Sequence, residues 1–240
     1  MIRLLVALLL LLLPAPLRAE TKSCRLPERL ESRACAQQGP SRGVAGQFDY
    51  YVLALSWSPA FCAEPRQARG NRLQCADNRF GFVVHGLWPQ YQEAQSGRNQ
   101  SGSNQPWPQY CQPDAAAVPE ALLRRHLCRQ PSAALMNCQW AKHGACSGLS
   151  MAAYFAAQEQ LMQRLTLPAL TPGPNTAGAV LDAFQNANAV LGLKREHMVL
   201  IVKDDALSEI RICYAKNLTE FVACGPGMRG SRPERKLILH

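Results

Sequence analysis

Two short segments of the chain each place a histidine where it could take part in chemistry. FVVHGLWPQ carries His85 in an apolar run, and QWAKHGAC carries Lys142 and His143 next to a cysteine-closed turn. The whole chain has only five histidines, and the placement of two of them in these segments suggests a function. If the second segment is helical, Gln139, Lys142 and His143 lie at positions i, i+3 and i+4 and share one face. That face would present an amide, an ammonium group and an imidazole together.

These residue types match the demands of cleaving RNA by its own 2′-hydroxyl group. Imidazoles titrate near neutral pH, so one can remove the hydroxyl proton while the other protonates the departing 5′-oxygen. The ammonium of Lys142 and the amide of Gln139 would stabilise the negative charge that develops on the phosphoryl oxygens. The nearby Trp88 could stack on a nucleobase without requiring a particular sequence.

Each of these residues also has a purely structural interpretation. A single buried histidine is usually a satisfied core residue, and for His143 taken alone the interpretation as a solvated surface residue is favoured. The combination of both histidine segments with a lysine, an amide and a tryptophan is what favours catalysis. A zinc site is a further alternative, but no C-x₂-C pair occurs and the histidines are scattered. We therefore expect no metal and no cofactor.

Strands must position the first histidine and helices the second. Aromatic and β-branched residues in FDYYVLALSWSPAFC predict a buried strand that ends in a turn at Pro59, and RFGFVVHGLW predicts another that ends at Pro89. Apolar residues at helical spacing predict helices in AAAVPEALLRRHLC, MAAYFAAQEQLMQRL and AVLDAFQNANAV. The stretch from Ser96 to Pro108 predicts a loop, and TLPALTPGPNTAG a proline-rich connector.

The C-terminal third predicts further strands. HMVLIVKDDALSEIRIC contains the polar turn KDDALS, after which Ile210 and Ile212 alternate with charged residues. Strands, then helices, then strands predict an α+β fold with a central antiparallel sheet and several helices in a single domain. The extension CGPGMRGSRPERKLILH leaves two alternatives open: its glycines and prolines favour mobility, whereas LILH could dock as a terminal strand.

The N-terminus predicts export. Arg3 precedes an apolar run from Leu4 to Leu13, followed by prolines and Ala19, which is typical of a secretory signal peptide over residues 1–19. The run is about half the ~20 residues of a membrane helix, so we expect a periplasmic or extracellular protein with no membrane partner. Without Arg3 and Arg18, 26 − 2 = 24 Lys and Arg face 17 Asp and Glu, a net charge of +7. This charge favours a polyanionic partner, although many exported proteins are basic for solubility.

Ten cysteines in an exported chain predict a fold stabilised by disulfides. Their local spacing suggests these pairs: Cys24–Cys35, Cys62–Cys75, Cys128–Cys138 and Cys213–Cys224, with Cys111 and Cys146 left for each other.

Several of these segments together resemble the ribonuclease T2 family. HGLWPQ and KHGAC resemble its two active-site segments, YVLALSW followed by FC its first core strand, and LSEIRIC its late strand, so that the likeness extends from Phe48 to Cys224. The AKHGAC form is most similar to periplasmic ribonucleases of bacteria. The resemblance implies an endoribonuclease domain over residues 20–240 that cleaves single-stranded RNA to 2′,3′-cyclic phosphates and then 3′-phosphates, with little base preference. We expect it to act as a monomer.

The resemblance also implies a role for each residue. His85 and His143 match the catalytic pair, with His143 the base and His85 the acid during cyclisation, and Lys142 matches the transition-state stabiliser. Trp88 matches the tryptophan on which a base stacks in the substrate-binding pocket. Tyr91 lies three residues after Trp88, and this spacing suggests that Tyr91 extends the same pocket.

Two positions depart from the family pattern. Many members have glutamate where this chain has Gln139, and eukaryotic members often have a histidine where it has Cys138. We expect Cys138 to weaken phosphate binding, whereas Gln139 removes a charge next to Lys142 and His143. The alternative is therefore a catalytically weakened relative that binds RNA or protein. A hydrolase with a cysteine nucleophile is a weaker alternative, because all ten cysteines can pair.

Overall fold

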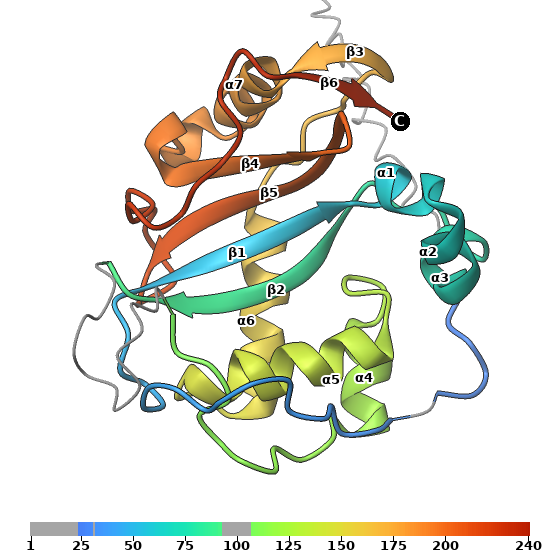
Figure 1. Cartoon of the computed structure of the whole chain (residues 1–240), viewed down its shortest axis with the longest axis vertical. Coiled ribbons are helices and arrows are strands. Elements are labelled where there is room, and N and C mark those ends of the chain that lie inside the picture. Colours follow the sequence, from blue (N-terminus) through green and yellow to red (C-terminus); the bar gives the residue numbers. More distant parts are fainter. Residues whose placement is uncertain (1–23, 31, 93–106) are drawn as a thin grey trace, which may run out of the picture.

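The structure, a computed structural model, describes residues 24–30, 32–92 and 107–240 (Figure 1). The predicted signal peptide and most of the predicted loop from Ser96 to Pro108 lie outside these residues. In the described part of the chain, no helix is long and apolar enough to cross a membrane.

Four antiparallel strands form the centre of the fold, in the spatial order β2-β1-β5-β4. They are β1 (Tyr50–Trp57), β2 (Phe82–Gln90), β4 (Met198–Lys203) and β5 (Ala206–Ala215). Every residue of β1 except Ser56 is buried, because the strand lies between two neighbours and both of its faces are covered. Burial on both faces explains why its sequence is a continuous apolar run.

Two short strands extend this sheet. The terminal segment LILH docks as β6 (Lys236–Leu239), which pairs in parallel with β5 at Ala206 and Ile238. β6 also pairs antiparallel with β3 (Gly173–Thr176), which lies in the stretch predicted to be only a connector. The sequence GPNT has low strand propensity, so this strand depends on its pairing with β6.

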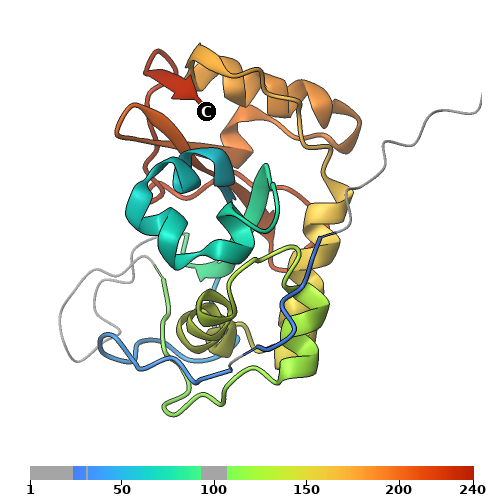
Figure 2. The same ribbon diagram turned by 90° about the vertical axis from the view of Figure 1, so that its right-hand side faces the viewer.

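Helices cover one face of the sheet, and others lie beyond its two edges. Figure 1 shows α6 (Met151–Arg164) behind the sheet, α4 (Glu120–His126) and α5 (Ala133–Lys142) beyond β2, and α7 (Ala177–Ala187) beyond β4. The short helices α1 (Ser58–Ala63), α2 (Pro65–Gly70) and α3 (Arg72–Cys75) follow β1 and lie nearest the viewer in Figure 2. The remaining helices are the 3₁₀ turns η1 (Gly144–Cys146), η2 (Ala189–Leu191) and η3 (Arg195–His197). The chain has the predicted α+β fold in a single domain.

Two predicted strand ends are wrong. β1 ends at Trp57, and Pro59 lies in the first turn of α1, where its missing N–H group costs no hydrogen bond. β2 continues through Pro89, which pairs with Tyr51. Proline is tolerated there because β2 is an edge strand, so one side of its backbone needs no partner within the sheet.

Five disulfides link the described residues, and two of the predicted pairs are wrong. The pairs predicted correctly are Cys62–Cys75, Cys111–Cys146 and Cys213–Cys224. Cys24 bonds to Cys128 and Cys35 to Cys138, over separations of 104 and 103 residues. Local spacing failed because the N-terminal segment does not fold on itself. It runs along α4 and α5, where the Arg124 guanidinium donates hydrogen bonds to its carbonyl groups.

Candidate active site

His85 occupies a β-bulge in β2. Ala54 pairs with Gly86 and Leu55 with Val84, so His85 has no partner on β1. A bulge bends its strand locally and changes the direction of a side chain. The side chain of His85 is 34% exposed in an otherwise buried stretch of the strand, and it faces a pocket. The apolar run of β2 thus presents a polar residue to solvent without breaking the sheet.

Gly86 allows β2 and α5 to approach each other closely. Trp88 Nε1 donates a hydrogen bond of 2.6 Å to Gln139 Oε1. A Cβ atom at position 86 would lie 2.1 Å from that oxygen and 2.5 Å from that nitrogen, so only glycine fits. Because an indole N–H can only donate, the bond fixes the orientation of the Gln139 carboxamide. Its amide nitrogen is therefore the group that remains for a ligand.

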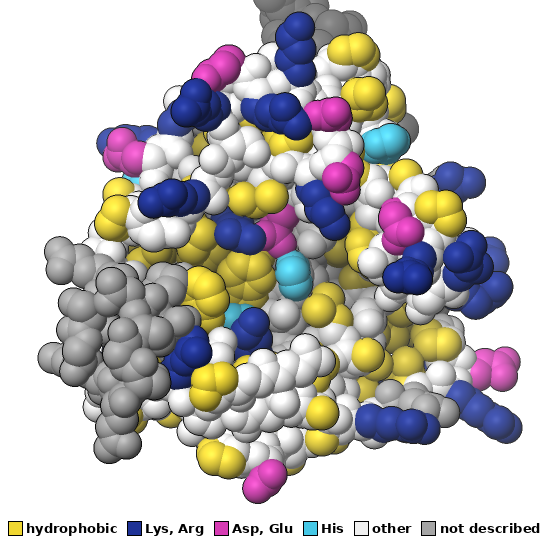
Figure 3. All heavy atoms as spheres, viewed as in Figure 1, with side chains coloured by type: hydrophobic (Ala, Val, Ile, Leu, Met, Phe, Trp, Pro, Cys, Tyr) yellow, Lys and Arg dark blue, Asp and Glu magenta, His cyan; other side chains and the backbone are white. Residues whose placement is uncertain are grey.

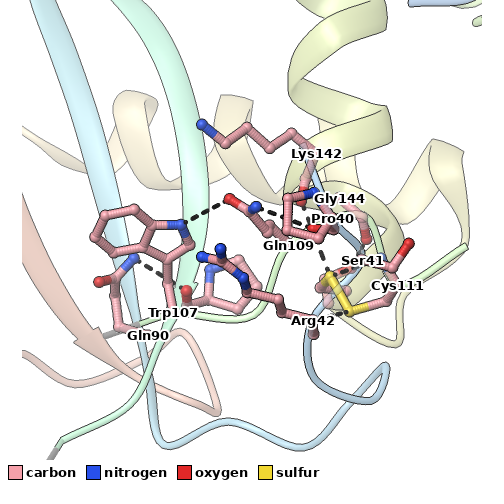
Figure 4. The surroundings of a disulfide bond; sticks show 12 residues. Pro40, Ser41, Arg42, Gln90, Trp107, Gln109, Cys111, Lys142 and Gly144 are labelled. Atoms are coloured by element: carbon pink, nitrogen blue, oxygen red, sulfur yellow. Dashed lines mark hydrogen bonds between the residues drawn. A yellow bond between two sulfur atoms is a disulfide. The ribbon is translucent and has the colours of Figure 1, made fainter. Parts of the chain in front are cut away.

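The end of α5 carries the second histidine. α5 is preceded by its N-cap residue Ser132, whose hydroxyl accepts a hydrogen bond from Leu135 N, and it is followed by its C-cap residue His143. The disulfide between Cys111 and Cys146 fixes the 3₁₀ turn that follows (Figure 4). Figure 4 also shows the Lys142 side chain extending away from this disulfide, toward the side on which Trp107 and Gln90 lie.

A pocket of about 290 Å³ lies between the outer face of the sheet and the end of α5. Its lining residues are His85, Trp88, Gln90, Trp107, Gln139, Lys142, His143, Arg211, Gly227 and Met228. Figure 3 shows basic, acidic and histidine side chains gathered around a hollow at the centre of this face. The pocket therefore brings together five of the six predicted site residues. Tyr91 is not among the lining residues; it packs against the hydrophobic core, with its hydroxyl beside Gly43.

Trp88 contacts both histidines. Its ring centroid lies 5.1 Å from that of His85, edge to face, and 5.5 Å from that of His143, at 33°. The guanidinium carbon of Arg211 lies 5.1 Å from the centroid of the same indole. The tryptophan is thus fixed in place between the two imidazoles rather than free to rotate.

His143 is held in its neutral form. Burial lowers the pKa of His143 well below its ordinary value, and the positive charges of Lys142 and His85 lower it further. Its Nδ1 atom has no hydrogen-bond partner among the described residues. A neutral imidazole beside a lysine is suited to accept a proton at neutral pH.

Glu209 and Arg211 were not predicted as site residues. Glu209 Oε2 lies 2.6 Å from His85 Nδ1, and Glu209 Oε1 accepts a hydrogen bond of 2.6 Å from Arg211 Nε. Arg211 Nη1 also lies 3.4 Å from the sulfur of Met228. The signal was present in LSEIRIC, where the two charged residues alternate with buried isoleucines and therefore occupy the other face of β5.

The lining suits an anion better than a metal ion. Lys142 and the amide nitrogen of Gln139 can bind phosphoryl oxygens, whereas Glu209 is already bound on both oxygens. Across the ranges that the structure describes, no three residues among His, Cys, Asp and Glu are grouped as metal ligands would be.

The sequence of the chain is similar to those of known ribonucleases. The model of the ribonuclease T2 family matches residues 48–224. A probable ribonuclease of Haemophilus influenzae is 42% identical over 127 residues, which are 50% of this chain and 44% of that protein, so the match spans less than half of it. A ribonuclease of Aeromonas hydrophila is 32% identical over 200 residues, 79% of this chain and 82% of that protein.

Solved structures share the fold. An RNase-related protein from Calystegia sepium has a TM-score of 0.59 at 23% identity, covering 80% of this chain and 96% of that one. A ribonuclease from the seeds of bitter gourd has a TM-score of 0.56 at 19% identity, and the match covers 80% of this chain and 100% of that one. The family model matches well over half of the chain, including both histidine segments. The chain therefore belongs to the ribonuclease T2 family.

Proposed function

We propose that this protein is an exported endoribonuclease that cleaves single-stranded RNA with little base specificity and without a metal ion. The observation that carries the proposal is the convergence of His85, His143, Lys142 and Gln139 on one pocket, with Trp88 between the histidines. Residues 1–19 would serve as the signal peptide, and residues 20–240 would form the catalytic domain of a monomer in the periplasm or outside the cell.

In the first step His143 removes the proton of the 2′-hydroxyl group, and the 2′-oxygen attacks phosphorus. The bond from phosphorus to the 5′-oxygen breaks, and His85 protonates that oxygen, which leaves a 2′,3′-cyclic phosphate. Lys142 and the Gln139 amide nitrogen stabilise the charge on the non-bridging oxygens. The lowered pKa of His143 supports this direction, because a base must be neutral before it can act.

In the second step the roles reverse. His85 removes a proton from water, the resulting hydroxide attacks phosphorus, and His143 protonates the departing 2′-oxygen. The product is a 3′-phosphate. Stacking of a base on Trp88 requires no particular base edge, which accounts for the low base preference.

Gln139 favours a second candidate, a weakened relative that binds RNA or protein. The assay that separates the two uses the purified protein in EDTA with a single-stranded RNA and with the same sequence 2′-O-methylated. We expect cleavage of the first and not the second, because methylation removes the nucleophile. Binding of both without cleavage would favour the second candidate, and cleavage that requires an added divalent cation would contradict the metal-free mechanism.

Replacement of Gln139 by glutamate should move the acid limb of the kcat/KM profile to higher pH. A carboxylate at position 139 favours the imidazolium form and so raises the pKa of His143, which must be neutral to act as base. The acid limb of the wild-type protein therefore lies at lower pH. The measurement is the profile of both proteins on a dinucleotide, with Gln160→Glu as control, since this substitution adds the same charge on an exposed part of α6. Coincident acid limbs for wild type and Gln139→Glu would show that residue 139 does not act on the base.

A further inference from the structure

Glu209 is a buried carboxylate with both oxygens occupied. Its side chain is 7% exposed, Oε2 lies 2.6 Å from His85 Nδ1, and Oε1 accepts a 2.6 Å hydrogen bond from Arg211 Nε. Arg211 in turn lies over the ring of Trp88. One carboxylate on β5 therefore contacts the histidine on β2 directly and the tryptophan on β2 through the arginine.

This carboxylate is held in its charged form. Burial alone would raise the pKa of Glu209, but the hydrogen bond and charge of His85 and the charge of Arg211 outweigh burial and lower it. A buried carboxylate is tolerated only when it is paired in this way. Glu209 is thus a fixed negative charge beside the imidazole, and it is not itself among the residues that line the pocket.

The contact determines which nitrogen of His85 carries the proton. A carboxylate accepts hydrogen bonds, so Nδ1 must be the protonated nitrogen, and Nε2 is left for the pocket. The backbone of His85 is fixed as well, because Gln130 Nε2 donates a 2.6 Å hydrogen bond to its carbonyl oxygen. The Nδ1–H tautomer serves both steps: cationic His85 can give a proton from Nε2, and neutral His85 can take one there.

We propose that Glu209 is a positioning residue for His85, which fixes its Nδ1–H tautomer and stabilises its cationic form for protonation of the 5′-oxygen. This inference rests on the proposed function. The titratable and charged groups that face His85 are Glu209 and Arg211 from β5, and Lys142 and the neutral His143 from the end of α5. Glu209 is the anion among them, so its removal leaves the cations Arg211 and Lys142 near His85 without a compensating negative charge.

The test compares kcat/KM profiles of the wild-type protein and Glu209→Gln on a dinucleotide. The base limb reports the group that must be protonated, and loss of the carboxylate disfavours cationic His85, so this limb should move to lower pH. We expect kcat to fall by about 10- to 100-fold, a part of what general acid catalysis contributes, with KM little changed. Glu209→Asp keeps the charge and should restore the base limb toward its wild-type position.

The matched control is Glu159→Gln. Glu159 Oε2 lies 3.1 Å from Nδ1 of another histidine, His126, but neither residue lines the pocket. Like Glu209→Gln, this control removes a carboxylate from a carboxylate–histidine pair. The kcat and the base limb of the Glu159→Gln variant should equal those of the wild-type protein. An active Glu209→Gln variant with an unchanged base limb would overturn the proposal while leaving the ribonuclease function intact.

A second measurement requires neither activity nor a stable variant. Nitrogen-15 NMR of the wild-type imidazoles reports which ring nitrogen carries the proton in the neutral form. We expect His85 to be protonated on Nδ1, and protonation on Nε2 would overturn the proposal. If the wild-type protein does not cleave RNA at all, the proposed function fails, and this spectrum still decides whether Glu209 fixes the tautomer.

Discussion

Replacement of either His85 or His143 by alanine should lower kcat/KM for RNA cleavage by about 10²- to 10⁴-fold, the range that general acid and base catalysis contributes. In the proposed mechanism each imidazole has one role in cyclisation and the opposite role in hydrolysis, so the loss of either one slows both steps. Because the two act as a unit, the double variant should be scarcely slower than either single one. The measurement is kcat/KM on a dinucleotide for all three variants.

The control for this series is His197→Ala. His197 is also buried and stacks on Phe221, at 5.7 Å between centroids, but it does not line the pocket. We expect it to lose stability and keep its activity, whereas the site variants should keep RNA binding and lose activity. Full activity in His85→Ala or His143→Ala would refute the assignment of that residue.

Removal of both disulfides of the N-terminal segment, Cys24–Cys128 and Cys35–Cys138, should cost at least about 5 kcal/mol of the free energy of unfolding. In the chain-entropy model the cost grows with loop length, so a loop of about 100 residues loses about 4.7 kcal/mol and one of about 15 residues about 3. Either bridge alone keeps the ends of the other close together, so separations of 104 and 103 residues are released only when both are removed, whereas Cys62–Cys75 closes 13. Cys138 also directly precedes Gln139 on α5, so activity should fall together with stability.

The measurement is urea unfolding of two variants: one replaces Cys24, Cys35, Cys128 and Cys138 by alanine, and the other replaces Cys62 and Cys75 by alanine. We expect the first to be the less stable, and equal losses would contradict the length dependence. Peptide mapping of the unreduced wild-type protein should link Cys24 to Cys128 and Cys35 to Cys138. Recovery of a Cys24–Cys35 peptide would instead support the pairing that local spacing suggested.

Five of the residues that line the pocket could be predicted because their signals are local. His85 and Trp88 lie three residues apart, and Gln139, Lys142 and His143 lie within one and a half helical turns, so spacing alone placed each group on one element. The strand β1 could also be predicted from the sequence, since burial on both faces requires a continuous apolar run. Tyr91 shows the limit of this reasoning, because it lies one residue past the end of β2 and its half-buried side chain packs against the core instead of lining the pocket.

Contacts between distant segments could not be predicted in the same way. His85 and Glu209 are 124 residues apart, and their contact depends on the order β2-β1-β5 and on the bulge in β2. The extension after Cys224 likewise reaches the site, since Gly227 and Met228 line the pocket although the family match ends before them. Such contacts are properties of the folded topology, which a linear pattern does not contain.

The most direct test of the mechanism is phosphorus-31 NMR of a dinucleoside monophosphate digested by the wild-type protein in EDTA. Transesterification predicts that the diester signal is replaced first by a 2′,3′-cyclic phosphate and then by a 3′-monophosphate. The cyclic species should accumulate, since the 2′-oxygen attacks before water does. Direct formation of a monophosphate, with no cyclic phosphate at any time or with the phosphate on the 5′-oxygen, would contradict the account.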